Sequence, residues 1–147
     1  MKLTRFTDYS LRVLIYLGLD DHDRVTIREI SAAYGISRNH LMKVVSNLTR
    51  MGYLDARRGP GGGISLARPA EEINLASVVH DMEDDMNLVE CFCGPGRCKI
   101  QPVCNLRSTL AQALEAYLQT LKSYTLADLL KPRDQLIELL LDHNPTR

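Results

Sequence analysis

The sequence predicts a mostly α-helical protein with a small β-hairpin wing: a winged helix-turn-helix plus a long dimerisation helix. Three observations support this fold class. Two amphipathic helical patterns are separated by a tight turn at Gly35. A glycine-rich loop, residues 59–63, joins two short extended runs directly after them. A long apolar stripe with a spacing near 3.5 residues then starts at about Asn105.

The chain opens with one predicted helix over about its first 20 residues, and polar residues 20–23 predict the turn that follows. A second helix begins after Thr26, which forms a capping box with Glu29. In both helices the apolar side chains recur at helical spacing. They are Phe6, Tyr9, Val13, Tyr16 and Leu17 in the first, and Ile27, Ile30 and Tyr34 in the second.

Gly35 ends the second helix, and Ser37 caps a third. Gly52 is suited to stop this third helix, since glycine readily adopts the left-handed conformation found after helix ends. We expect its buried face to carry Leu41, Val44, Val45, Leu48 and Met51.

The hairpin that follows is predicted to be a wing. Residues 53–58 and 64–69 are extended runs on either side of the glycine loop. A nucleotide-binding loop is disfavoured, because the glycines do not lead from a strand into a helix that carries Lys and Ser or Thr. Residues 1–70 therefore predict a winged helix-turn-helix DNA-binding domain.

Residues 71–104 are assigned to a connecting helix, capped by Asn74, and a loop that holds every cysteine of the chain. Residues 105–130 are assigned to the dimerisation helix, with Thr125 and Asp128 capping a further short turn. Its apolar stripe either packs on a partner helix or covers the chain's own core; we favour dimerisation, because a winged helix needs two copies to read a palindrome. The stripe comprises Leu106, Leu110, Ala113, Tyr117, Leu121 and Tyr124.

Residues 131–147 form a C-terminal tail with a short helix that starts near Pro132. Its apolar residues include Leu136, Leu140 and Leu141. The tail is expected either to pack on the dimerisation helix or to fray, and the sequence gives no function for it.

The charge distribution favours nucleic-acid binding by the first half. Residues 1–70 carry eleven Lys and Arg against six Asp and Glu, net +5, whereas residues 71–147 carry seven against twelve, net −5. The exposed face of the third helix, together with the two arginines before the glycine loop, offers side chains that suit bases and phosphates. The candidate DNA contacts are Arg38, Asn39, His40, Lys43, Ser46 and Asn47 on a face that also carries Arg50, and Arg57 and Arg58 on the wing.

All four cysteines, Cys91, Cys93, Cys98 and Cys104, fall within fourteen residues. Gly94, Pro95 and Gly96 predict a bend that lets several sulfurs converge on one point. Thiolates suit zinc or an iron–sulfur cluster. The spacing lacks the paired C-x2-C knuckles of zinc ribbons and the ferredoxin C-x2-C-x2-C run, which disfavours both.

No signal peptide or membrane-spanning run is evident, so we expect a cytoplasmic protein whose clustered thiols stay reduced. That compartment favours metal ligands or redox centres over disulfides. No pair of groups at catalytic spacing stands out, and an enzyme is not predicted.

The chain resembles the winged-helix iron–sulfur repressor family over about residues 1–130, and most of all its nitric-oxide-sensing members. Taken together the shared motifs are specific, although the loop glycines alone are not. The motifs are residues 3–9 (LTRFTDY), 36–44 (ISRNHLMKV), 58–67 (RGPGGGISLA), 87–91 (NLVEC) and 102–104 (PVC).

This resemblance implies a homodimeric repressor on a palindromic DNA operator, with nitric oxide as effector. It implies an iron–sulfur cluster, 4Fe-4S or alternatively 2Fe-2S, held by Cys91, Cys98 and Cys104. Cys93 is an additional cysteine that departs from the family pattern. Three roles are open to it: a ligand in place of Cys91, a fourth ligand or a bystander. The resemblance also offers Asp8 of the other subunit as fourth ligand, although an acidic residue there equally suits the start of a helix.

Three alternatives stay open. Cluster-biogenesis relatives place a histidine three residues after the third cysteine, where this chain has Arg107, which counts against an iron–sulfur-homeostasis regulator. A metal-free thiol-redox switch would instead pair Cys91 or Cys93 with Cys98 or Cys104. An iron–sulfur electron-transfer protein would not bind palindromic DNA tightly.

Overall fold

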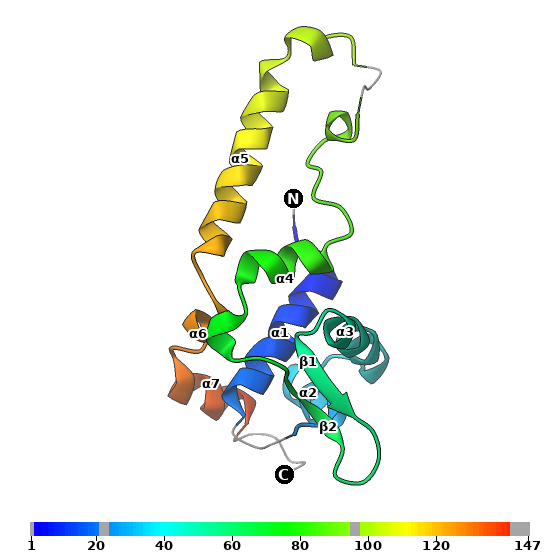
Figure 1. Ribbon diagram of the computed structural model, residues 1–147, viewed down its shortest axis with the longest axis vertical. Helices are drawn as coiled ribbons and strands as arrows, with labels where there is room; N and C mark the ends of the chain where they lie inside the picture. Colours follow the sequence, from blue (N-terminus) through cyan, green and yellow to red (C-terminus); the bar gives the residue numbers. More distant parts are fainter. Residues whose placement is uncertain (1, 21–23, 95–97, 142–147) are drawn as a thin grey trace.

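The structure, a computed structural model, describes residues 2–20, 24–94 and 98–141 (Figure 1). Residues 21–23 of the predicted turn, residues 95 and 96 of the predicted bend, and tail residues 142–147 lie outside the described residues. The order is α1 (Arg5–Leu19), α2 (Ile27–Tyr34), α3 (Arg38–Arg50), β1 (Leu54–Arg57), β2 (Gly63–Leu66), η1 (Ala70–Glu72), α4 (Leu75–Met82), η2 (Glu90–Phe92), η3 (Gln101–Val103), α5 (Asn105–Lys122), α6 (Leu126–Leu129) and α7 (Arg133–Leu140). The predicted fold class, mostly α with a β-hairpin wing, is confirmed.

The helix starts are set by local capping, as the sequence predicts. Thr26 and Glu29 form the predicted capping box at α2. The Ser37 hydroxyl accepts a hydrogen bond from the N–H of His40 at 3.3 Å and so begins α3. Asn74 accepts from two backbone N–H groups at the start of α4.

The core lies where α1, α2 and α3 meet, and α4 packs on α1. Leu14, Tyr16, Ile30 and Leu41 are fully buried there. The turn between α2 and α3 passes through Gly35 at φ 64°, a conformation that costs an L-residue strain. Met51, predicted for the buried face, is 39% exposed; the prediction was wrong because α3 ends at Arg50 and Met51 lies in the turn.

The wing is an antiparallel hairpin in which Leu54 pairs with Leu66 and Arg57 with Gly63. Ile64 joins it to the core, because its backbone exchanges hydrogen bonds of 2.9 and 2.7 Å with Val25. Figure 1 shows the hairpin loop at the opposite end of the molecule from the loop that contains η2 and η3.

The long helix is shorter than predicted: α5 ends at Lys122, not at residue 130. The predicted capping box of Thr125 and Asp128 starts α6 after a break. Leu126 explains the break, because its side chain is fully buried and its N–H donates to the Ile73 carbonyl at 2.8 Å. The chain therefore turns back to the core, while α5 extends away from it (Figure 1).

The tail helix α7 packs on α1 rather than on α5. The Arg133 guanidinium donates to the carbonyls of Gly18 and Leu19 at 3.2 and 3.0 Å, which neutralises acceptors at the end of α1. Leu141 completes this contact as a buried core residue. The tail was predicted either to pack on the dimerisation helix or to fray. Within this chain its described part instead packs on α1. Within the described ranges no helix has the length and apolar character needed to cross a membrane.

Candidate nucleic-acid interface and metal centre

The exposed face of α3 carries most of the predicted DNA contacts. Its opposite face is anchored in the core, so the helix has a fixed orientation. Because Ser37 caps the N-terminus, the side chains just after it lie at the end that usually reaches deepest into a groove. The exposed predicted residues are Arg38, Asn39, His40, Lys43 and Ser46.

Asn47 differs from the other predicted contacts because its amide is engaged inside the protein. Its Nδ2 donates to the Met82 sulfur at 3.5 Å, and its Oδ1 accepts from the Arg50 guanidinium. Met82 is the last residue of α4 and is buried. Asn47 therefore ties α3 to α4, and a role in reading bases would require it to give up these partners.

The wing arginines are exposed, and a third arginine that sequence analysis missed holds the hairpin in place. Arg24 donates to the Asp55 carboxylate at 2.6 Å and to the Gly63 carbonyl at 3.2 Å. The Arg24 hydrogen bond, followed by the charges of Arg24 and Arg57, lowers the pKa of Asp55. Arg57 lies 3.4 Å from the same carboxylate, whereas no ion pair is found for the described Arg58 side chain. The Arg24–Asp55 contact joins residues 31 apart, so no local pattern could reveal it.

A hollow of about 850 Å³ opens beside the exposed face of α3, and we call it the α3 hollow. Most of its lining comes from α3, but Asp84 enters it from the segment after α4. The lining residues are Phe6, Asn39, Met42, Lys43, Ser46, Asn47, Arg50 and Asp84.

All four cysteines are free thiols, with Cys93 and Cys98 exposed and Cys91 and Cys104 half-buried. Cys91 lies in η2, and Cys104 immediately precedes α5. The structure does not bring the predicted ligands together: among residues 2–20, 24–94 and 98–141, no three His, Cys, Asp or Glu side chains are close enough to hold a metal ion. The donor set nevertheless fits a thiophilic centre, since all four thiols are unpaired in one loop.

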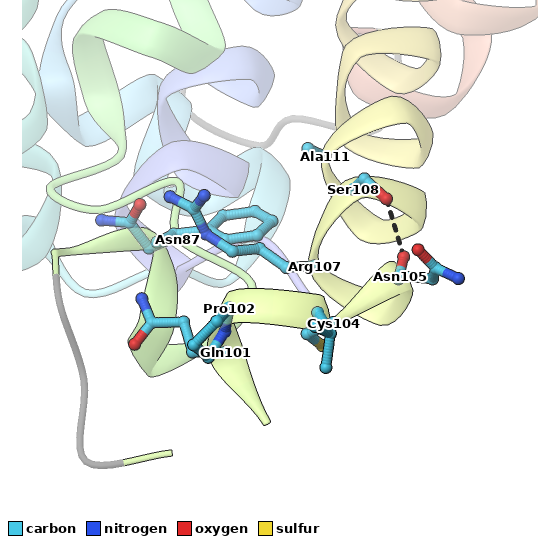
Figure 2. Close-up of a pocket in the computed structure, with 10 residues that line it drawn as sticks. Asn87, Gln101, Pro102, Cys104, Asn105, Arg107, Ser108 and Ala111 are labelled. Carbon is cyan, nitrogen blue, oxygen red and sulfur yellow. Dashed lines mark hydrogen bonds between the residues drawn. The ribbon is translucent and has the colours of Figure 1, made fainter. Parts of the chain in front are cut away.

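A pocket of about 510 Å³ lies between the cysteine loop and the first turns of α5 (Figure 2). Cys104 and Phe92 line it, and Figure 2 shows Arg107 extending from α5 towards Asn87. The Arg107 Nε donates to the Cys91 carbonyl at 3.1 Å, which ties the first cysteine to the helix that follows the last. Arg107 therefore acts as a clamp between the backbone at Cys91 and α5, and we call this contact the Arg107 clamp.

The start of α5 lacks a side-chain cap, because Cys104 occupies the N-cap position and makes no capping hydrogen bond. The free N–H groups of a first helical turn favour negative charge nearby. A thiolate on Cys104, or an anionic centre bound to it, is therefore electrostatically compatible with this end of α5.

Asp8, the predicted ligand from the other subunit, lies in the first turn of α1 and pairs with Arg12 at 2.9 Å. Its side chain remains 44% exposed. A carboxylate on the surface of α1 is open to a second chain, but ligation would require it to loosen the pair with Arg12. A surface ion pair of this kind contributes only about 0–1 kcal/mol, so breaking the pair with Arg12 to bind a metal would cost little.

No residue of α5 is buried within the chain. Leu106 is 62% exposed, and Leu110, Leu114, Tyr117 and Leu121 are half-buried. The helix α5 has 18 residues and an apolar stripe, but none of its side chains is buried in the chain's own core. This combination is typical of a helix that packs on another chain.

A winged helix-turn-helix with a cationic, exposed third helix and two arginines on its wing defines a DNA-binding regulator of transcription. The profile of the Rrf2 family, described as iron-dependent transcriptional regulators, matches residues 3–132. The chain therefore belongs to the Rrf2 family, which confirms the resemblance found in the sequence. Its relatives are regulators of transcription, not enzymes.

Two curated relatives are similar over most of their length. The HTH-type transcriptional regulator NsrR of Geobacillus kaustophilus is 48% identical over 142 residues, covering 95% of this chain and 97% of the relative. NsrR of Bacillus subtilis is 49% identical with the same coverage.

Solved structures share the fold. CymR of B. subtilis, the global cysteine regulator, superposes with a TM-score of 0.71 at 22% identity, covering 88% of this chain and 95% of that one. IscR of T. potens gives a TM-score of 0.71 at 20% identity and covers 92% and 90%. At these identities the likeness concerns the fold alone.

Proposed function

We propose that the chain is a homodimeric transcriptional repressor whose affinity for a palindromic DNA operator is set by an iron–sulfur cluster that senses nitric oxide. The observation that carries this proposal is the position of the four free thiols, in one loop that ends at the uncapped start of α5. The identity of 44–49% to regulators named NsrR supports the nitric-oxide response. We place the protein in the cytoplasm, where DNA and reduced thiols coexist.

The thiolates of Cys91, Cys98 and Cys104 are the proposed ligands. Cys93 is a bystander, and Asp8 of the partner is the fourth ligand of a 4Fe-4S centre, with 2Fe-2S as the alternative. When bound, the centre supplies iron atoms with which nitric oxide reacts. The Arg107 Nε donates to the Cys91 carbonyl at 3.1 Å and so ties the start of the proposed ligand loop to α5.

Two α5 helices, one from each chain, form the proposed dimer contact and set the distance between the recognition helices. On each half-site the proposed contacts to bases come from the first turn of α3, and the contacts to phosphates come from the rest of its face and the wing. The base-reading residues are Arg38, Asn39 and His40; the phosphate contacts are Lys43, Ser46, Arg57 and Arg58, with Asn47 at the edge of this surface.

If Cys91, Cys98 and Cys104 were no longer held together at one centre, the loop would lose its fixed position and the protein would release DNA. The segment between Met82 and Cys104 then no longer holds α5 and the partner's α1 in register, and the two recognition helices lose their spacing. A hundredfold loss of affinity requires about 2.7 kcal/mol of differential binding, which loss of one or two ligand bonds can supply.

The test is an anaerobic purification followed by iron and acid-labile sulfide assays and an absorption spectrum. A brown protein with iron and sulfide in each chain, whose spectrum changes on titration with nitric oxide, is the expected result. Colourless protein with stoichiometric zinc contradicts the cluster. Metal-free protein that binds DNA only when reduced would instead establish the thiol-redox switch, which the exposed free thiols Cys93 and Cys98 also permit.

A further inference from the structure

We infer that Asp84 is part of the DNA-binding surface and lowers the affinity for DNA by electrostatic repulsion of the phosphate backbone. This inference rests on the proposed DNA-binding face of α3, but not on the cluster. Asp84 is the only acidic residue that lines the α3 hollow, among the described residues, where its neighbours include Lys43 and Arg50. An exposed carboxylate there faces the same phosphates that these cations attract.

The residues before Asp84 fix its place beside α3. Met82 is buried and its sulfur accepts from Asn47 of α3 at 3.5 Å. Glu83 accepts from the N–H of Thr4 at 2.8 Å and from its hydroxyl at 3.1 Å, next to the start of α1. With both preceding residues anchored to the winged helix, the backbone at Asp84 is held beside α3, and its exposed carboxylate lines the α3 hollow.

Asp85, the next residue, faces elsewhere. It lines a different pocket of about 470 Å³ with Leu3, Leu114 and Tyr117, away from the α3 face. Two adjacent carboxylates of equal charge therefore lie in different surroundings, which gives a matched control. Neutralising either one changes the net charge of the protein equally, but only Asp84 is placed against the proposed phosphate path.

The consequence is a DNA-binding surface with a built-in opposing charge. Repulsion of phosphates by Asp84 offsets part of the attraction from Lys43 and Arg50, which line the same hollow. Asp84 also lies seven residues before Cys91, in the segment that leads from the winged helix to that loop.

The experiment compares Asp84→Asn, Asp85→Asn and the wild type as full-length protein. Fluorescence anisotropy is measured on a duplex selected by the wild type from a random-sequence pool, and on an unrelated duplex of equal length. We expect Asp84→Asn to bind both duplexes at least about threefold more tightly at 0.05 M salt, and the gain to shrink at 0.5 M salt. Asp85→Asn should stay within about 1.5-fold of the wild type, since only long-range charge changes.

Equal gains for both variants would show a net-charge effect and overturn the inference. Weaker binding of Asp84→Asn to the selected duplex alone would also overturn it, because Asp84 would then accept a hydrogen bond from a base. Lys43→Ala separates this failure from failure of the proposed face: if Lys43→Ala weakens binding while Asp84→Asn changes nothing, only the inference on Asp84 falls. If Lys43→Ala has no effect, both fall.

Discussion

The Gly62→Ala substitution tests whether the wing touches DNA. A methyl group at Gly62 would lie 2.8 Å from the Gly59 carbonyl oxygen, 2.9 Å from the Arg58 carbonyl carbon, and closer still to the Arg57 carbonyl oxygen. These atoms belong to the backbone and cannot move away as a flexible side chain can. The hairpin loop must therefore open, and the hydrogen bond from the Gly62 N–H to the Gly59 carbonyl, 2.9 Å long, is lost.

The local cost is about 1–3 kcal/mol, the usual range for overpacking. Because the wing is joined to the core through Ile64 and Val25, the rest of the domain should stay folded. Each phosphate contact contributes about 0.9 to the magnitude of the slope of log K against log salt. This corresponds to about eightfold in affinity at 0.1 M salt, relative to 1 M salt. If each displaced wing loses one such contact, through Arg57 or Arg58, the affinity of a dimer for DNA falls about 60-fold.

The assay is a salt titration of binding to the selected duplex, with the thermal unfolding midpoint as a check on folding. Gly61→Asn is the control, since Gly61 has φ 72°, nothing lies within 4 Å of an added Cβ, and asparagine tolerates this conformation. It should bind as the wild type does. A folded Gly62→Ala protein with unchanged affinity and unchanged salt slope would refute the reasoning and remove the wing from the DNA-binding surface.

Three further predictions concern the cysteine loop, the ligand from the partner and the capping box at the start of α6. Cys98→Ser should lose its iron and Cys93→Ser should keep it; iron loss in Cys93→Ser would make that residue a ligand. Asp8→Ala should retain iron with an altered absorption spectrum, and an unaltered spectrum removes Asp8 from the ligand set. The hydrogen bond from Lys131 is the first cause that lowers the pKa of Asp128 to about 2. The stabilisation by the Asp128 charge is therefore fully present above the ordinary pKa of 3.8 and is lost as the pH falls through about 2. The unfolding midpoints of wild type and Asp128→Asn should therefore differ most at pH 6, and the difference should largely disappear near pH 2. A difference that does not vary with pH would contradict this.

Local patterns predicted the helix starts well. The caps at Thr26, Ser37, Asn74 and Thr125 each depend on a side chain within three residues of the N–H groups that it accepts from, so the sequence contains all the necessary information. The glycine loop was equally predictable, because Gly59, Gly61 and Gly63 adopt positive φ angles, which favour glycine.

Features set by packing were not predictable in the same way. The end of α5 depends on the burial of Leu126 near Ile73, and the place of α7 depends on hydrogen bonds from Arg133 to the end of α1. The hydrogen bond from Asn47 to Met82 could not be predicted, because the two residues are 35 positions apart in the chain. The position of Asp84 beside α3 could not be read from the sequence for the same reason.

The candidate metal centre was identified by residue type and spacing alone. The four thiols lie in one loop, as the sequence requires, but their convergence on a single point and the role of Asp8 depend on a bound group and a second chain. These assignments stay predictions. The Arg107 clamp joins the cysteine loop to α5, whereas Met82 and Glu83 join the segment before the loop to the winged helix.

The most direct test of the central claim is the dissociation constant of the iron-loaded protein for the selected duplex, measured anaerobically before and after titration with nitric oxide. The account predicts a loss of affinity of at least about a hundredfold, equivalent to about 2.7 kcal/mol, that tracks the change in the iron absorption spectrum. An unchanged dissociation constant after the spectrum has fully changed would contradict it.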